Sequence, residues 1–152
     1  MDIDILKAEL KDMEAILQLQ KDCYLSEAEI YNNFEIEPLK QNIDSLMNEF
    51  KNSTILKAVI NGEIIGSVRG YAEKDNLYIG KLIVKSEYQN KGIGRLLLYS
   101  MESFFNDCKR VELFTGLKSE KNLHLYTKQG YTEFKKQYID DNLTLVYLEK
   151  KN

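Results

Sequence analysis

The spacing of hydrophobic residues predicts one strand and two helices at the start of the chain. Apolar and polar residues alternate over residues 3–8, which is typical of a strand. From residue 12 to residue 31 the apolar residues recur at helical spacing, and we expect Asp12 to cap this helix. A second helix is expected over residues 38–50, because Pro38 is tolerated in a first helical turn.

The middle of the chain reads as three consecutive strands. Residues 54–60 and 63–73 are rich in β-branched side chains and flank the pair Asn61-Gly62. An Asn-Gly pair between two such runs predicts a tight hairpin. Residues 76–84 form a further strand, whose last three residues are apolar on both faces, so we expect it to be central and buried.

The C-terminal half alternates helices and strands before it closes with two strands. Residues 92–107 carry a broad apolar stripe typical of a core-facing helix, and residues 110–116 form the next strand. A short helix is expected from a possible cap at Ser119 to Gly130. The last two strands are expected at residues 131–139 and 142–150. The order βααβββαβαββ predicts an α/β (α+β) fold with a mixed, mostly antiparallel sheet of about seven strands and about four helices.

Composition narrows the class of protein. A length of 152 residues, of which 43% are hydrophobic and 30% charged, predicts one globular domain over residues 1–152. No apolar run reaches the roughly 18 residues of a membrane-spanning helix, and the N-terminus lacks an apolar export signal. Cys23 and Cys108 have no metal-binding spacing and there is one histidine, so we expect no metal site. These features predict a cytoplasmic protein.

Charge is distributed unevenly along the chain. Residues 1–50 contain 12 acidic and 4 basic residues, whereas residues 51–152 contain 12 acidic and 17 basic residues. This asymmetry fits either two partners of opposite charge or ordinary solvated faces. The chain has no basic stripe with interleaved aromatic residues, so we expect neither a nucleic acid nor a membrane as partner.

A short polar link between a buried strand and a helix carries the clearest chemical signal. Two glycines stand one residue apart where the helix begins, and the amides of a first helical turn lack intrahelical acceptors and favour anions. A phosphate or pyrophosphate site is therefore predicted here. Its candidate residues are Gln89, Asn90, Lys91, Gly92, Ile93, Gly94 and Arg95. A Walker loop is absent, and a dinucleotide fingerprint lacks its third glycine because Leu97 stands at that position.

The stretch "VKSEYQNKGIGRLLL" resembles the acetyl-coenzyme A loop of the GCN5-related N-acetyltransferase (GNAT) family, whose signature is Q/R-x-x-G-x-G/A after a strand ending in valine. A second stretch, "LFTGLKSEKNLHLYTKQGY", resembles the family's later strand, short helix and LYxKxGY ending. The resemblance implies a V-shaped splay between the fourth and fifth strands. It also implies acetyl-CoA as co-substrate, held by backbone groups of Leu82, Ile83 and Val84, by the loop 89–95 and by Asn122 or Ser119.

The same resemblance implies catalytic roles. Tyr126 stands at the family's tyrosine position and is the candidate general acid for the leaving thiol. Many relatives carry a glutamate base four residues before the terminal valine, where this chain has Gly80. Glu73, acting through water, is the candidate base, and Glu27 and Glu35 are the alternatives.

The acceptor site is expected under the first helices and the loop that follows them. This segment interleaves carboxylates with aromatic residues, which suits a cation. Glu27, Tyr31 and Glu35 are its candidate residues. We therefore predict an N-acetyltransferase that acts on a small cationic or lysine-like amine, as a monomer or homodimer. The alternative is a non-catalytic module that binds or senses acyl-CoA on the same fold.

Overall fold

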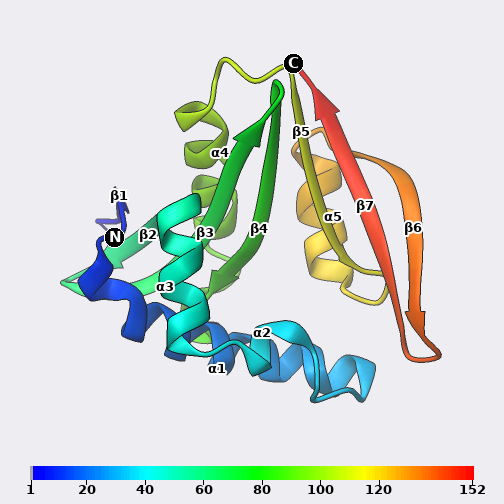
Figure 1. The fold of residues 1–152 in the computed structure, drawn as a ribbon, viewed down its shortest axis with the longest axis horizontal. Helices are drawn as coiled ribbons and strands as arrows, with labels where there is room; N and C mark the ends of the chain where they lie inside the picture. The colour runs from blue at the N-terminus through cyan, green and yellow to red at the C-terminus, as the bar shows by residue number, and fades with distance from the viewer. Residues whose placement is uncertain (1) are drawn as a thin grey trace.

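The computed structural model describes residues 2–152 and contains seven strands, five α-helices and two short 3-10 turns (Figure 1). The strands are β1 (Asp4–Lys7), β2 (Thr54–Ile60), β3 (Glu63–Glu73), β4 (Asn76–Val84), β5 (Arg110–Gly116), β6 (Thr132–Asp140) and β7 (Leu143–Lys151). The helices are α1 (Met13–Tyr31), α2 (Glu37–Lys40), α3 (Ile43–Asn52), α4 (Ile93–Phe104) and α5 (Glu120–Lys128), with turns η1 (Leu10–Asp12) and η2 (Ser86–Tyr88).

All seven strands form one sheet in the order β1-β2-β3-β4-β5-β7-β6. Neighbouring strands are antiparallel except β4 and β5, which are parallel and are joined by the crossover helix α4. The predicted mixed, mostly antiparallel fold is thereby confirmed. The predicted hairpin is confirmed as well, because Asn61 and Gly62 both have positive φ, at 50° and 80°, as a primed two-residue turn requires.

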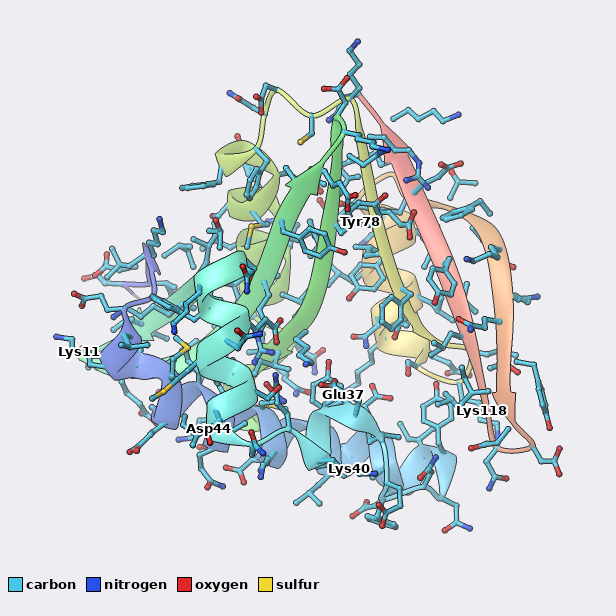
Figure 2. All side chains as sticks on the ribbon, in the orientation of Figure 1. Lys11, Glu37, Lys40, Asp44, Tyr78 and Lys118 are labelled. Carbon is cyan, nitrogen blue, oxygen red and sulfur yellow. The ribbon has the colours of Figure 1, made fainter. Side chains whose placement is uncertain are left out.

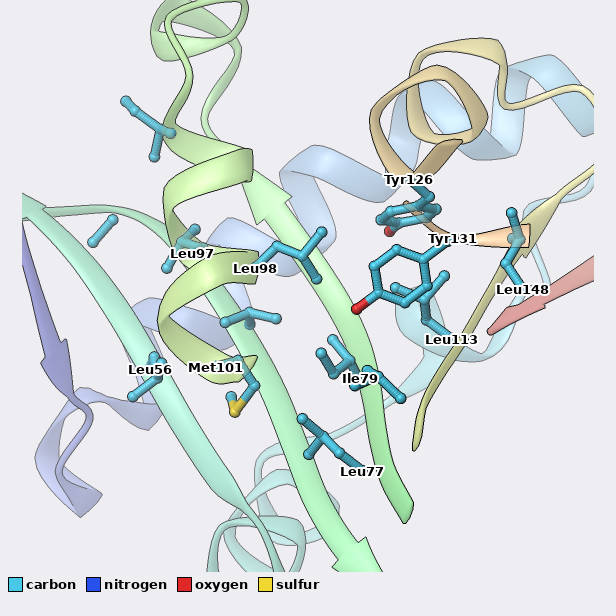
Figure 3. Close-up of a cluster of buried hydrophobic side chains, with 14 of the residues drawn as sticks. Leu56, Leu77, Ile79, Leu97, Leu98, Met101, Leu113, Tyr126, Tyr131 and Leu148 are labelled. Carbon is cyan, nitrogen blue, oxygen red and sulfur yellow. The ribbon is translucent and has the colours of Figure 1, made fainter. Parts of the chain in front are cut away.

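Helices cover both faces of the sheet. Successive residues of a strand point to opposite faces, and on β2 the neighbours Ile55 and Leu56 belong to two different hydrophobic clusters. Ile55 packs with residues of α1 and α3, whereas Leu56 belongs to the larger cluster that includes α4. Figure 3 shows this larger cluster, in which α4 and the tyrosines Tyr126 and Tyr131 pack against the middle of the sheet.

The sheet opens into a V between its two parallel strands (Figure 1). β4 and β5 pair over only three residues, and Tyr78 opposite Glu112 is the last pair. A β-bulge lies just beyond this point, since β4 contains one extra residue relative to β3 at Lys81, whose φ is 48°. Bulges bend a strand and increase its twist, so the bulge favours the divergence of β4 from β5. The predicted splay between the fourth and fifth strands is confirmed.

Three local predictions are wrong. The helix expected over residues 38–50 is two helices, because Asn42 is extended and its side chain accepts the Ser45 amide at 2.8 Å, which starts α3 afresh. Asp12 does not cap α1; its carboxylate accepts the Glu9 amide and pairs with Lys57 at 2.7 Å. Ser119 precedes α5 without a side-chain capping bond, because its hydroxyl is bonded elsewhere.

Candidate active site

A cleft of about 1000 Å³ occupies the opening of the V. Its walls come from β3, β4, β5 and β7, and from α1, α5 and the segment that precedes α2. Of the residues predicted from the sequence, six line it: Glu27, Tyr31, Glu35, Leu82, Asn122 and Tyr126. The predicted acceptor residues and the predicted general acid therefore share one cavity with part of the predicted cofactor strand.

The β4 side of the cleft presents backbone without a strand partner. Pairing with β5 stops at Tyr78, so the β5-facing backbone groups of Leu82, Ile83 and Val84 have no β5 partner. The carbonyl of Val84 accepts the side-chain amide of Gln89 at 3.0 Å and the thiol of Cys23 at 3.4 Å. This end of β4 is thus held in place, and its free edge suits an extended ligand that adds as a strand.

The loop that follows β4 is exposed over residues 89–92. Asn90 and Gly92 both have positive φ, at 62° and 82°, and α4 begins directly after Gly92. Lys91 and Arg95 line a hollow of about 430 Å³ beside this helix start. Exposed first-turn amides with two cations nearby are the arrangement that a pyrophosphate requires.

The two glycines of this loop serve different needs. Gly92 adopts a left-handed conformation that strains residues with a side chain. Gly94 has no such conformation, and a Cβ there would meet only Leu125 and Val84 at ordinary contact distances of 3.5 and 4.0 Å. A Cβ at Gly94 therefore fits the protein's own packing, whereas the open space in front of the helix start lies at Gly92, where a Cβ would meet no atom within 4 Å.

Tyr126 lies on α5 and is 5% exposed, with its ring 6.1 Å from that of Tyr131 (Figure 3). Within residues 2–152 its hydroxyl has no hydrogen-bonding partner, so it is available to a ligand in the cleft. Burial raises the pKa of Tyr126, and the negative charge of Glu27 raises it further. The phenol is therefore protonated at neutral pH.

Glu27 belongs to a chain of hydrogen bonds that crosses the cleft wall. The Ser119 hydroxyl donates to the Glu27 carboxylate at 2.7 Å, and Tyr31 Oη lies 2.7 Å from the same hydroxyl. The Lys118 amide donates to Tyr31 Oη at 2.9 Å. Because Ser119 gives its proton to Glu27, the Tyr31 hydroxyl donates to Ser119. Whether Ser119 or Asn122 contacts the cofactor stays open. Ser119 is buried, whereas Asn122 lines the cleft and its side-chain amide donates to Thr115 Oγ1 at 3.2 Å.

The other predicted carboxylates lie farther from Tyr126 in the fold. Glu35 is exposed on the loop that precedes α2, where it lines the cleft and lies 3.7 Å from Lys40. Glu73 ends β3 at the turn into β4, is exposed, and is not among the residues that line the cleft. Its role as base stays a prediction, and Glu27 is the carboxylate that the fold brings beside the phenol.

Sequence reasoning missed a set of cleft residues on the strands. They share one face of the sheet, where alternate positions of β3, β4, β5 and β7 point into the cleft. They are Arg69, Tyr71, Tyr78, Glu112, Phe114 and Tyr147. The period-2 alternation of each strand contained this signal, but only the register between strands shows that these side chains meet.

Within residues 2–152, no helix is long and apolar enough to cross a membrane. The same part of the chain contains no group of three or more His, Cys, Asp or Glu side chains placed to hold a metal ion.

Comparison with known proteins points to one family. The model of the acetyltransferase (GNAT) family matches residues 13–131. YqkA, a UPF0157 protein of Bacillus subtilis, is 27% identical over 116 residues, which are 76% of this chain and 33% of that protein. An uncharacterized N-acetyltransferase of Methanocaldococcus jannaschii is 30% identical over 100 residues, which are 62% of this chain and 64% of that protein. The chain thus spans less than two thirds of the length of both curated relatives.

Solved structures share the whole fold at low sequence identity. A PaiA N-acetyltransferase from Thermoplasma acidophilum, crystallised in complex with coenzyme A, superposes with a TM-score of 0.81 at 21% identity, and the match covers 100% of both chains. The ribosomal-protein-S18-alanine N-acetyltransferase from Escherichia coli also gives 0.81, at 14% identity, over 99% of this chain and 94% of that one.

Proposed function

This chain belongs to the acetyltransferase (GNAT) family, and from that premise we propose that it transfers the acetyl group of acetyl-CoA to a primary amine of a small cationic or lysine-like acceptor. The single observation that carries the proposal is the position of Tyr126, a buried residue that lines the cleft beside the unpaired edge of β4 and whose hydroxyl bonds to no other residue within 2–152.

The proposed acetyl-CoA site runs from the edge of β4 to the start of α4. An extended pantetheine arm would pair with the backbone of Leu82, Ile83 and Val84, which has no β5 partner, and the pyrophosphate would face the amides from Gly92 to Arg95. The residues present fit this group, because the space around Gly92 in front of the helix is open and Lys91 and Arg95 add positive charge. When bound, acetyl-CoA supplies an activated acyl carbon.

The chemistry forms one bond and breaks another. The amine nitrogen bonds to the acyl carbon, the carbon–sulfur bond breaks, and the electron pair of that bond leaves on sulfur. The amine loses a proton to a base, and the departing sulfur takes a proton from an acid. Tyr126 is the proposed acid, because its raised pKa keeps the proton on the phenol until a thiolate is formed.

An acceptor amine must reach the acyl carbon without its extra proton. A lysine-like amine with a pKa near 10.4 is almost wholly protonated at neutral pH. We propose Glu27 as the group that takes this proton through water, because Glu27 lines the cleft and its charge acts directly on Tyr126. Its contact with the Ser119 hydroxyl fixes the direction of the carboxylate.

The charge of the cleft favours a cationic acceptor. Five carboxylates and two cations line it, which gives a formal charge of −3. The carboxylates are Glu27, Glu35, Glu37, Glu49 and Glu112, and the cations are Arg69 and Lys81. Both cations are already paired, Arg69 with Glu49 at 2.9 Å and Lys81 with Glu37 at 2.9 Å. Glu35 and Glu112 are paired as well, with Lys40 at 3.7 Å and with Arg110 at 2.9 Å. Within residues 2–152, Glu27 is thus the lining carboxylate without an ion pair, and an ammonium group in the cleft would meet its negative charge.

The test is the detection of an acetylated product. The protein is incubated with acetyl-CoA and a panel of amines, amino acids and lysine peptides, and products are identified by mass spectrometry. The proposal predicts acetylated cationic amines and no product from anionic acceptors. Coenzyme A binding without product from any amine favours the alternative, a non-catalytic sensing module. Activity only on anionic or neutral acceptors contradicts the proposed acceptor class.

A further inference from the structure

The cleft extends well beyond the proposed reaction point. It continues along β4 toward the end where β4 and β5 are still paired, and there its wall is formed by Tyr71, Tyr78 and Glu112. Figure 2 labels Tyr78 near the paired end of the V and Glu37 near its open end, so the two mark opposite ends of the cavity. The proposed reaction uses only the part near Tyr126.

The three residues at the far end form one cross-strand row. Tyr71 is the register partner of Tyr78, and Tyr78 is the partner of Glu112, so all three side chains project from the same face. The two tyrosine rings stack with centroids 5.2 Å apart and an interplanar angle of 25°. The row thus presents aromatic rings directly beside a carboxylate.

The carboxylate in this row is only partly neutralised. Arg110 pairs with Glu112 at 2.9 Å and with Glu149 at 2.6 Å, so one guanidinium is shared by two carboxylates. The three groups together carry a formal charge of −1. Burial raises the pKa of the Tyr71 phenol, and the charges of Glu73 and Glu112 raise it further.

Gly80 lines the cleft between its two ends. It lies two residues after Tyr78 on β4, and a Cβ built on it meets no atom within 4 Å. A side chain there would project into the cavity between Tyr78 and Leu82. Because a strand rises about 3.3 Å per residue, the passage from Tyr78 to Leu82 is at most about 13 Å long.

We propose that Tyr71, Tyr78 and Glu112 form a subsite for a second cationic group of the acceptor, which reaches it over Gly80. The acceptor is then an elongated amine with two positive charges: one amine reacts beside Tyr126, and the other is held between aromatic rings and Glu112. Aromatic faces attract ammonium groups, and Glu112 adds a net charge of the right sign. This inference rests on the proposed function and deepens it by naming the acceptor class.

The experiment compares α,ω-diamines with n-alkylamines of equal chain length, using acetyl-CoA and the full chain. Wild-type protein is expected to show a kcat/KM about tenfold higher for diamines long enough to span the passage than for the matched monoamines. Glu112→Gln removes this preference, and Gly80→Val lowers kcat/KM for long diamines but not for short amines. Glu133→Gln, which removes a charge on β6 outside the cleft lining, serves as the matched control and retains the preference.

Calorimetry separates failure of this inference from failure of the proposed function. Diamine binding is titrated in the presence of coenzyme A, with wild-type protein, Glu112→Gln and Glu133→Gln. If no amine is acetylated, the proposed function fails, and weakened diamine binding in Glu112→Gln alone still supports the subsite. Equal use of diamines and monoamines, or equal losses in Glu112→Gln and Glu133→Gln, overturns the subsite.

Discussion

The hydroxyl of Tyr31, at the end of α1, lies 2.7 Å from Oγ of Ser119, at the start of α5, although 88 positions separate them in the chain. The same hydroxyl also accepts the Lys118 amide at 2.9 Å. These contacts join the helix that roofs the acceptor side of the cleft to the helix that carries Tyr126. The distance between the proposed acid and the acceptor wall is therefore fixed by a tertiary contact.

Gly116 makes this contact possible, and its replacement is expected to break it. A Cβ at Gly116 would overlap the hydroxyl end of Tyr31. Gly116→Ala is therefore predicted to lower the free energy of unfolding by about 1–3 kcal/mol, as overpacking does, measured by urea denaturation. Adding Tyr31→Ala removes the overlapping ring together with its hydroxyl and recovers part of the loss. Additive losses in the double variant would contradict this reading of the contact.

Gly94 and Gly92 are predicted to respond differently to substitution. Gly94→Val adds a branched side chain in the first turn of α4, close to its first amides, so the affinity for coenzyme A is expected to fall by about tenfold or more. Gly92→Ala imposes a left-handed conformation on alanine and costs about 1–2 kcal/mol of stability. Calorimetric titration with coenzyme A and thermal melts measure the two effects. A Gly94→Val protein that binds coenzyme A normally contradicts the assignment of the loop.

Tyr126→Phe tests the proposed acid. The variant removes one hydroxyl that has no protein partner within residues 2–152, so stability is expected to change little. We predict that kcat falls by at least about tenfold, in the range of general acid catalysis, while the Kd for coenzyme A is nearly unchanged. Steady-state kinetics and calorimetry provide the two numbers. Unchanged turnover removes Tyr126 from the mechanism.

The dependence of rate on pH follows from the raised pKa of Tyr126. A phenol whose pKa lies above its usual value of about 10 keeps its proton through pH 10, so the acid is not lost as pH rises. We therefore expect kcat/KM to rise with pH as base and acceptor amine lose protons, with no decline up to about pH 10. An alkaline decline with a midpoint below that value, absent from Tyr126→Phe, would show that the phenol ionises normally.

Glu27→Gln tests the proposed base against a close neighbour. Glu29 is exposed on the same helix and is not among the residues lining the cleft, so Glu29→Gln is the matched control. Glu27→Gln is predicted to lower kcat/KM by about a hundredfold at pH 7, with partial recovery at high pH, where the amine deprotonates without help. Glu29→Gln retains activity. If both variants are equally active, Glu73 and Glu35 become the candidate bases instead of Glu27.

The sequence predicted the strands and the place of the loop 89–95 between β4 and α4 well because their signals are local. Turn residues such as Asn61-Gly62, alternating apolar residues and the spaced glycines each act within a few positions. The break at Asn42 was missed because Gln41 turns inward to bond Gln20, Glu49 and Arg69, contacts that are distant in sequence. The cleft residues on β3, β4 and β5 were missed for the same reason, since the register between strands brings them together.

Acetyl transfer from acetyl-CoA to an amine releases free coenzyme A, so thiol release follows the proposed reaction for any acceptor. Free coenzyme A is followed with a thiol reagent while wild-type protein and Tyr126→Phe receive acetyl-CoA with a panel of cationic, neutral and anionic acceptors. We expect thiol release that depends on cationic amines and falls by at least about tenfold in Tyr126→Phe. Coenzyme A binding with no amine-dependent thiol release from wild-type protein would contradict the proposed reaction.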